Sequence, residues 1–314
     1  MNIGTVISKV IQLLFILLVG IYTRKREFID RSTVKSLAKY LSNVTNPLLI
    51  VCSFQLDYST ELLILGGKIF IGALLIHVVS AILAYLVFRP KKGSCENAIY
   101  EFTVIFGNCA FMGFPILAAV YGDIGIVYGS FYNAVFNLFF WTYGILILTR
   151  HKNTDGKMSL NWKQLILNPG VLATVGGILL YVLQIKIPDM LLGGMKMVGD
   201  STFPLAMIII GALIVELDFK AAFRDLKFYI GAALKLLIIP GLALLFCVLF
   251  RVEPLITYVL VTLSAMPSAT FGAIFAEIYG VNPVTGAKIV CLTTILSIAT
   301  VPLLLFVAQA ALGV

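Results

Sequence analysis

The stretch GNCAFMGFP, residues 107–115, places two glycines, an asparagine and a proline in the middle of an apolar run. A second interruption of the same kind, SAMPSATFG, covers residues 264–272, about half a chain further on. A proline inside a helix removes a backbone donor and clashes with the preceding turn, and a glycine such as Gly113 lets the chain unwind. The two stretches therefore predict helices that are broken at Pro115 and at Pro267.

The composition around these breaks is that of a membrane protein. The 314-residue chain is 60% hydrophobic and 12% charged, whereas a soluble domain is about 45–50% apolar and about 25% charged. Too few charges are available to cover a water-facing surface, which excludes a soluble enzyme, a disordered chain and a collagen-like fibre. The apolar runs are continuous, unlike the alternating strands of a barrel. They predict an all-α integral membrane protein, because a helix satisfies its own backbone in lipid.

Ten apolar runs approach the roughly 20 residues that a spanning helix needs. They cover residues 4–23, 34–55, 67–88, 98–120, 125–149, 164–184, 200–216, 228–250, 254–279 and 285–310. Most of the 23 lysine and arginine residues lie in the loops that follow odd-numbered runs. Cytoplasmic loops are enriched in these residues. We therefore expect a multi-pass protein of the cell membrane with both termini outside and the basic loops in the cytosol. This bias accounts for the net charge of +8 without a nucleic-acid partner.

The most polar connector, residues 151–163, divides the runs into two sets of five. Because five is odd, the second set must enter the membrane in the opposite orientation, as in many secondary transporters. We expect two inverted five-helix repeats, residues 1–150 and 164–314, joined by a cytosolic linker.

Prolines mark corresponding places in the two halves. Pro47 and Pro204 lie in runs 2 and 7, and Pro115 and Pro267 lie in runs 4 and 9. Interrupted helices in matching positions are the best sequence indication of a transporter binding site. Runs 4 and 9 are therefore the candidate site.

A broken helix exposes new helix ends near the middle of the bilayer. Free N–H groups after Pro115 and Pro267 would carry about half a positive charge from the helix dipole. Such ends bind carboxylate or phosphate without a cationic side chain. Asn108 adds an amide, and Ser268 and Thr270 add hydroxyl groups. These residues predict a binding site for a small organic anion.

Run 5 carries a separate polar group, formed by Tyr132, Asn133 and Asn137. Asn133 and Asn137 share one face of a helix. One interpretation is hydrogen bonding between helices, worth about 0.6–2 kcal/mol per contact. The other is that these side chains donate to the substrate, and the pattern alone leaves both open.

Ionisable residues within the spans are costly and usually functional. His77, near the middle of run 3, would couple transport to protons or be satisfied by a neighbouring carbonyl. Lys235, in run 8, would pair with the substrate or extend its amine to the cytosolic face. Glu101 and Glu277 lie near the cytosolic ends of runs 4 and 9, at matching places. These two carboxylates would line the cytosolic entrance to the binding site, form ion pairs of a gate there, or be solvated at the helix ends.

Several catalytic patterns are absent from the sequence. It contains no GxxxxGK[ST], HExxH or GxSxG motif and no cysteine pairs with metal-ligand spacing. We therefore expect neither ATP-driven transport nor an enzyme, no metal site, and no cofactor other than a coupling ion, H+ or Na+.

Short motifs follow one another in a distinctive order along nearly the whole chain. They are Asn46–Leu49, Asn108–Pro115 with Tyr121-Gly122, Asn168-Pro169, Pro204–Ala206 with Gly211, Ala265–Ala269 with Tyr279-Gly280, and Ser297–Pro302. In this order they resemble the auxin efflux carrier family of membrane transporters in its short prokaryotic form. That form includes bacterial permeases for malate and other organic acids. The bile acid:sodium symporters are similar at a greater distance.

The resemblance implies more than the residues show by themselves. Helices 4 and 9 would cross at Pro115 and Pro267, with a polar residue of helix 5 lining the pocket. Helices 1, 2, 6 and 7 would form a scaffold that assembles as a homodimer. Helices 3–5 and 8–10 would form a moving transport domain. The substrate would be an organic acid such as malate or auxin.

The sequence thus predicts a secondary carrier that moves small organic anions by alternating access of the elevator type. A sodium-coupled symporter stays open, because unwound backbone carbonyls can hold Na+. Two further alternatives are a membrane sensor that binds the anion without moving it and a channel.

Overall fold

Every regular element that the structure describes is a helix. The computed structural model describes residues 3–88, 95–149, 167–215, 226–269 and 283–313. Within these ranges, the only β-type pairing is a single antiparallel bridge between Gly107 and Ser268. Five helical stretches in them are long and apolar enough to cross a membrane, namely Thr60–Val87, Asp123–Thr149, Asp189–Val215, Leu226–Leu249 and Lys288–Leu312. The predicted all-α membrane fold is confirmed, and the ten-helix inverted repeat stays a prediction.

The helices form two compact units that do not follow the order of the chain. Unit 1 comprises residues 1–70, 110–137 and 166–216, and unit 2 comprises residues 71–109, 138–165 and 217–314. Helix α4 (Thr60–Val87) contributes to both units. The division into two repeats, and the division into scaffold and transport domain, stay predictions.

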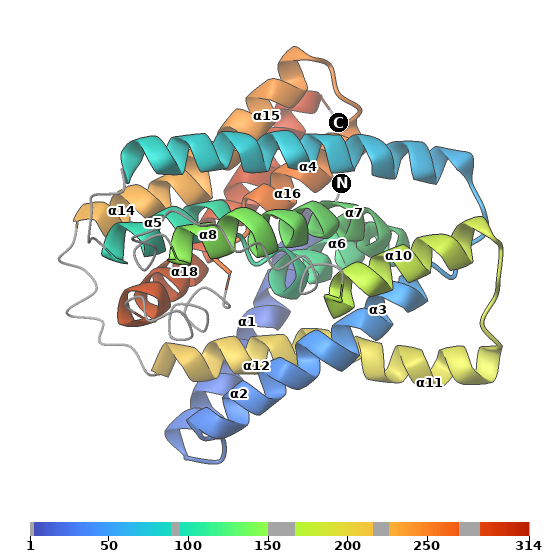
Figure 1. Cartoon of the computed structure of the whole chain (residues 1–314), viewed down its shortest axis with the longest axis horizontal. Coiled ribbons are helices and arrows are strands. Elements are labelled where there is room, and N and C mark those ends of the chain that lie inside the picture. The colour runs from blue at the N-terminus through green and yellow to red at the C-terminus, as the bar shows by residue number, and fades with distance from the viewer. Residues whose placement is uncertain (1–2, 89–94, 150–166, 216–225, 270–282, 314) are drawn as a thin grey trace. The chain divides into compact units, whose positions relative to one another are not determined.

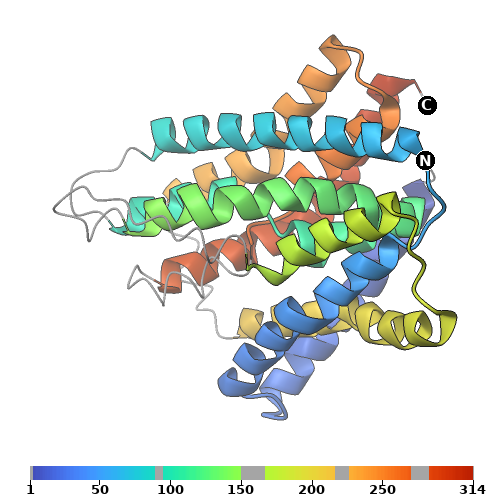
Figure 2. The same ribbon diagram turned by 45° about the vertical axis from the view of Figure 1, so that its right-hand side comes forward.

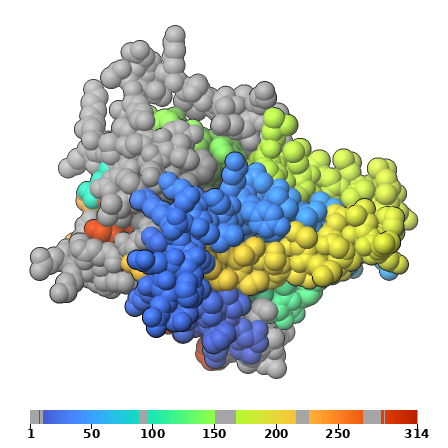
Figure 3. Space-filling view, turned by 90° about the horizontal axis from the view of Figure 1, so that it is seen from below, coloured from blue at the N-terminus to red at the C-terminus, as the bar shows by residue number. Residues whose placement is uncertain are grey.

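Unit 1 is built around a long rod and the helices beside it. The rod consists of α2, η1 and α3, which run on without interruption (Figures 1 and 2). Helix α3 packs against α10 and α11, and α1 packs against α12. Figure 3 shows α2 and α3, in blue, beside α11 and α12, in yellow. The helices of this unit are α1 (Ile3–Lys25), α2 (Arg31–Tyr40), η1 (Leu41–Thr45), α3 (Asn46–Ser53), α6 (Phe114–Tyr121), most of α7 (Asp123–Phe139), α10 (Pro169–Val182), α11 (Asp189–Asp200) and α12 (Thr202–Val215).

Glycines allow α1 and α12 to meet backbone to backbone. A Cβ atom added at Gly20 would collide with the carbonyl oxygen of Ile208, and one added at Gly211 would collide with the carbonyl of Leu17. Small residues permit such close approach of membrane helices, where dispersion rather than the hydrophobic effect drives packing. The two glycines therefore fix how α1 and α12 cross.

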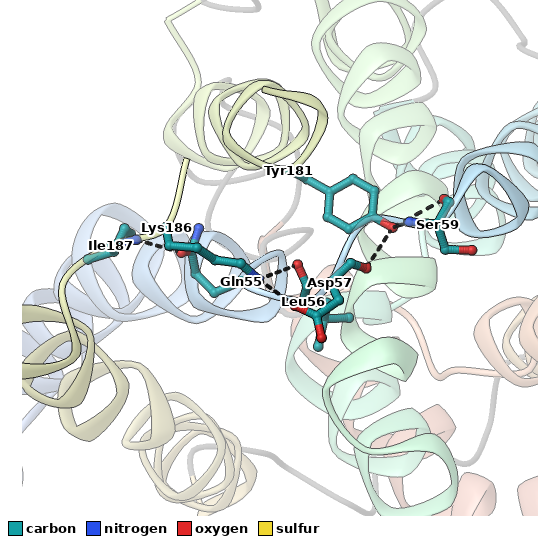
Figure 4. Close-up of polar contacts among 7 residues, drawn as sticks. All are labelled: Gln55, Leu56, Asp57, Ser59, Tyr181, Lys186 and Ile187. Carbon is teal, nitrogen blue, oxygen red and sulfur yellow. Dashed lines mark hydrogen bonds and ion pairs between the residues drawn. The ribbon is translucent and has the colours of Figure 1, made fainter. Parts of the chain in front are cut away.

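In unit 1, hydrogen bonds and an ion pair connect the loop after α3 to the end of α10 and the loop after it (Figure 4). The hydroxyl of Tyr181 accepts a hydrogen bond from the Ser59 amide and lies 3.1 Å from the Ser59 carbonyl oxygen. The ammonium of Lys186 donates to the Leu56 carbonyl at 2.7 Å and pairs with the exposed Asp57 carboxylate at 3.1 Å. The hydrogen bonds to backbone atoms fix the path of both loops, whereas an exposed ion pair contributes little to the stability of the fold.

Unit 2 is packed around α18 and α5. Helix α18 contacts α5, α14, α15 and α16, and α5 also contacts α8 and α14. The rings of Phe102, Phe106 and Phe140 lie within 5.5 Å of one another, centroid to centroid. The helices of this unit, besides part of α4, are α5 (Cys95–Ile105), η3 (Phe140–Gly144), α8 (Ile145–Thr149), α14 (Leu226–Ala233), η4 (Leu234–Ile238), α15 (Ile239–Leu249), α16 (Pro254–Ser264) and α18 (Pro283–Leu312).

Three prolines follow wide π-type turns, whereas Pro302 lies within the continuous helix α18. The turns η1, η2 (Cys109–Gly113) and η4 each end just before a helix whose second residue is Pro47, Pro115 or Pro240. A π turn inserts an extra residue, which relieves the clash between a proline ring and the preceding turn. The predicted break at Pro115 is therefore misplaced. The helix is interrupted at Gly107 and Asn108, ahead of η2.

The seventh run begins earlier than the sequence predicts. Residues 200–216 were the expected span, but helix α11 already starts at Asp189, and a short irregularity at Ser201 separates it from α12. Helix α11 contains glycines and a lysine, which lower its hydropathy without preventing a helix. Hydropathy alone therefore misses it.

Candidate functional site

In unit 2, the extended residues that follow α5 pair with the extended residues that follow α16. The amide of Asn108 donates to the carbonyl of Pro267 at 2.7 Å, and the amide of Ala269 donates to the carbonyl of Phe106 at 2.8 Å. These bonds form the bridge between residues 107 and 268. We call residues 106–109 and 266–269 the paired peptides. All of their residues are buried, and all belong to unit 2.

Ser268 is held on both sides by the protein. Its hydroxyl donates to the carbonyl of Thr103 at 2.8 Å, and its amide donates to the hydroxyl of Thr293 at 3.1 Å. Only 1% of the residue is exposed. Both of its hydrogens are therefore used within unit 2, which does not fit the predicted role as a donor to an anion. Thr270 and Glu277, the other predicted residues after Pro267, lie outside the described residues.

The helix ends at the paired peptides are mainly C-terminal. Helix α5 ends at Ile105 and α16 ends at Ser264. Each such end carries about half a negative charge and unpaired carbonyl groups. The N-terminal end that follows Asn108 begins at Cys109, whose thiol lies 3.7 Å from the Leu263 carbonyl. A cation rather than an anion is favoured beside α5 and α16.

Lys235 supplies that cation, although the sequence allowed its amine to reach the cytosolic face. The residue is only 3% exposed, and its Nζ donates to the carbonyl of Ser264 at 3.3 Å. A Cβ atom added at Gly107 would lie 2.8 Å from Nζ. The expectation that Lys235 extends to the cytosol is wrong, because a glycine opposite it leaves room for a buried amine.

His77 and Glu101 are also buried in unit 2. His77 Nδ1 lies 2.8 Å from the carbonyl of Ala73, one turn earlier in α4, and its ring lies 5.3 Å from that of Phe139. Glu101 is fully buried and accepts a hydrogen bond from the Tyr143 hydroxyl at 2.8 Å. A solvated position for Glu101 is therefore excluded, because α5 is enclosed by α8, α14 and α18.

Three asparagine side chains converge in unit 1 at the start of α10. A Cβ atom added at Gly170 would lie 3.2 Å from Asn168 Oδ1, 3.5 Å from Asn137 Nδ2 and 4.0 Å from Asn133 Nδ2. Asn133 and Asn137 are 5% and 8% exposed. We call Asn133, Asn137 and Asn168 the asparagine cluster. Tyr132, predicted to belong with them, is buried in the same helix.

The three residues of the asparagine cluster differ in the hydrogen bonds that their side chains make. Asn137 Nδ2 donates to the Asn133 carbonyl at 2.9 Å, within α7. Asn168 Oδ1 accepts from the amides of Gly170 and Val171 at 2.9 and 3.2 Å and caps α10. Among the described residues, the Asn133 amide group makes no hydrogen bond, so it can donate to a ligand. The sequence signal for Asn168 is its place before a proline that opens a helix.

We expect Asn168→Ala to lower the free energy of unfolding by about 1 kcal/mol, because two amides of α10 lose their acceptor. Thermal unfolding of the purified protein in detergent measures the effect. Asn168→Asp retains the cap and serves as the control. Equal losses of stability in both variants would contradict the capping role.

Metal chemistry finds no support in the described ranges, where no three His, Cys, Asp or Glu side chains gather as metal ligands. The cysteines described there, Cys52, Cys109, Cys247 and Cys291, are buried and free.

Comparisons with known proteins identify the class. Residues 5–305 match the family model described as "Membrane transport protein". A protein named "Uncharacterized transporter" from Methanothermobacter thermautotrophicus is 25% identical over 300 residues, covering 94% of this chain and 95% of that protein. "Uncharacterized transporter YfdV" from Escherichia coli K12 is 22% identical over 315 residues, covering 96% and 98%.

The chain belongs to the membrane transport protein family, which is the auxin efflux carrier family that its motifs resemble. It is a multi-pass membrane protein of a transporter family and not an enzyme. "Uncharacterized transporter MJ1031" from Methanocaldococcus jannaschii is a similar protein, 22% identical over 306 residues and covering 94% of this chain and 96% of its own.

Proposed function

We propose that this protein is a secondary carrier of small organic anions, such as malate-like or auxin-like carboxylates, in the cell membrane. Alternating access would follow from movement of one domain relative to the other, with the elevator type of motion. The observation that carries the proposal is the pairing of the interruption after α5 with the segment after α16, through buried backbone at Gly107 and Ser268. Discontinuous helices with exposed ends are the usual ion and substrate sites of secondary transporters.

The asparagine cluster supports an anion as the substrate. The Asn133 amide is nearly buried and unpaired among the described residues, and an amide hydrogen bonds a carboxylate without a permanent charge. The first turn of α10 brings the positive end of a helix dipole to the same place. Neutral donors at a helix N-terminus recognise carboxylate with little cost of burying charge.

Transport can be tested with purified protein in liposomes. We expect uptake of radiolabelled malate or indole-3-acetate into loaded liposomes, with faster uptake when unlabelled substrate is inside, because a carrier exchanges its substrate. Liposomes without the protein provide the control. Binding of these acids without uptake or counterflow would contradict the proposal in favour of a sensor. Electrical conductance far above carrier turnover would contradict it in favour of a channel.

A further inference from the structure

Lys235 is buried in η4, and no acidic residue that the structure describes pairs with it. Only 3% of the residue is exposed. An ammonium taken out of water costs several kcal/mol unless the protein supplies compensating groups. The residue lies in η4, the wide turn of its helix, ahead of Pro240. Within the described ranges, the groups that stabilise the charge are therefore not carboxylates.

The compensating groups are the C-terminal ends of two helices. Lys235 Nζ donates to the carbonyl of Ser264, the last residue of α16. A Cβ atom at Gly107, two residues beyond the end of α5, would lie 2.8 Å from Nζ and 3.3 Å from the carbonyl oxygen of Met266. The ammonium thus lies near the C-terminal ends of both α5 and α16, where the two dipoles present partial negative charge.

Carriers with interrupted helices commonly hold a transported cation at such ends, coordinated by unwound backbone carbonyls. We propose that the ammonium of Lys235 is a resident cation that occupies this place permanently, holds the paired peptides together and makes Na+ unnecessary for transport. Lys235 is then a positioning residue. The part that concerns flux rests on the proposed carrier function, whereas the part that concerns stability does not.

The absence of a side chain at Gly107 leaves space for the Lys235 amine. The glycine has no Cβ, and any side chain there would displace Nζ or the Met266 carbonyl. Removing the Lys235 side chain would leave a cavity beside Gly107 and the carbonyl of Ser264. Such a cavity is suited to a small alkylammonium ion, because the ammonium would recover the hydrogen bond to Ser264.

The stability test compares three substitutions in detergent-purified protein. We expect Lys235→Ala and Lys235→Met to lower the melting temperature by roughly 3–6 °C, since the buried Ser264 carbonyl loses its donor. Lys235→Arg should lower it less. Propylammonium chloride should raise the melting temperature of Lys235→Ala alone, because the methionine stem fills the cavity. Lys39→Met, at an exposed position of α2, is the control for loss of a lysine charge. Wild-type stability of Lys235→Met, or no response of Lys235→Ala to propylammonium, would overturn the proposal.

The flux test uses the same proteins in liposomes with malate or indole-3-acetate. We expect wild-type uptake to be unchanged when Na+ is replaced by K+. Uptake by Lys235→Ala should fall by about tenfold or more, a typical size of coupling between sites, and recover partly with propylammonium. Uptake by the wild type that requires Na+ would overturn the resident cation. If the wild type moves neither acid, the carrier function fails for these substrates, and the melting temperatures decide the inference alone.

Discussion

Gly211→Ala is expected to destabilise the folded protein by about 1–3 kcal/mol, because it overpacks a tight contact. A glycine-to-alanine change in a helix normally stabilises by about 0.4–1 kcal/mol, since alanine restricts the unfolded chain. Here the added Cβ would collide with the Leu17 carbonyl and lie 2.9 Å from the Ile21 amide nitrogen. Both are backbone atoms of α1, so α12 must move away from α1 as a whole.

The matched control for this prediction is Gly176→Ala in α10. No atom lies within 4 Å of a Cβ at Gly176, so the ordinary stabilising effect of alanine should appear there. Thermal unfolding of both variants in the same detergent measures the difference. Shifts of the same sign and size in the two variants would show that α1 and α12 do not pack as closely as described.

The membrane fold follows from features that the sequence displays locally. Charge-poor runs of sufficient length predict helices. The run at residues 285–310 corresponds to α18 within two residues at each end, and the run at 67–88 corresponds to α4, which begins seven residues earlier, at Thr60. The cap of α10 is equally local, because Asn168 and Pro169 are neighbours. Such features depend on a few adjacent residues, and the chain elsewhere does little to change them.

The location of the helix interruption is not a local property. The sequence assigns it to Pro115, but a π turn accommodates that proline in the second position of α6. The chain is instead extended at Asn108, whose amide bonds to Pro267. Pairing with a distant peptide therefore determines where the helix is interrupted. Local helix propensity cannot predict that position.

The roles of buried polar groups depend still more on distant partners. Ser268 bonds to the carbonyl of Thr103, 165 residues away, and Lys235 bonds to that of Ser264, 29 residues away. Residue type correctly marks both as unusual within a bilayer. Residue type does not reveal that the Ser268 hydroxyl already donates to a backbone carbonyl or that the Lys235 amine is buried.

Asn133→Asp is expected to lower anion uptake about 100-fold, equivalent to roughly 2.7 kcal/mol. The two side chains have nearly the same shape, but the carboxylate replaces the N–H donors of the amide with acceptors. It also places a negative charge where we propose that the substrate carboxylate binds, and like charges in contact cost several kcal/mol. Initial uptake rates in liposomes, normalised to the amount of folded protein, measure the effect.

Two further substitutions separate loss of binding from loss of folding. Asn43→Asp introduces the same charge at an exposed position of η1 and should leave uptake within about twofold, because exposed charges are screened. Asn133→Ser retains a neutral donor and should reduce uptake by about tenfold at most, the loss of roughly one hydrogen bond. Should Asn133→Asp prove too unstable to purify, Asn133→Ala tests the same donor without a new charge. Wild-type uptake by a folded Asn133→Asp or Asn133→Ala protein would remove Asn133 from the anion site, since a donor that binds the carboxylate cannot be lost without cost.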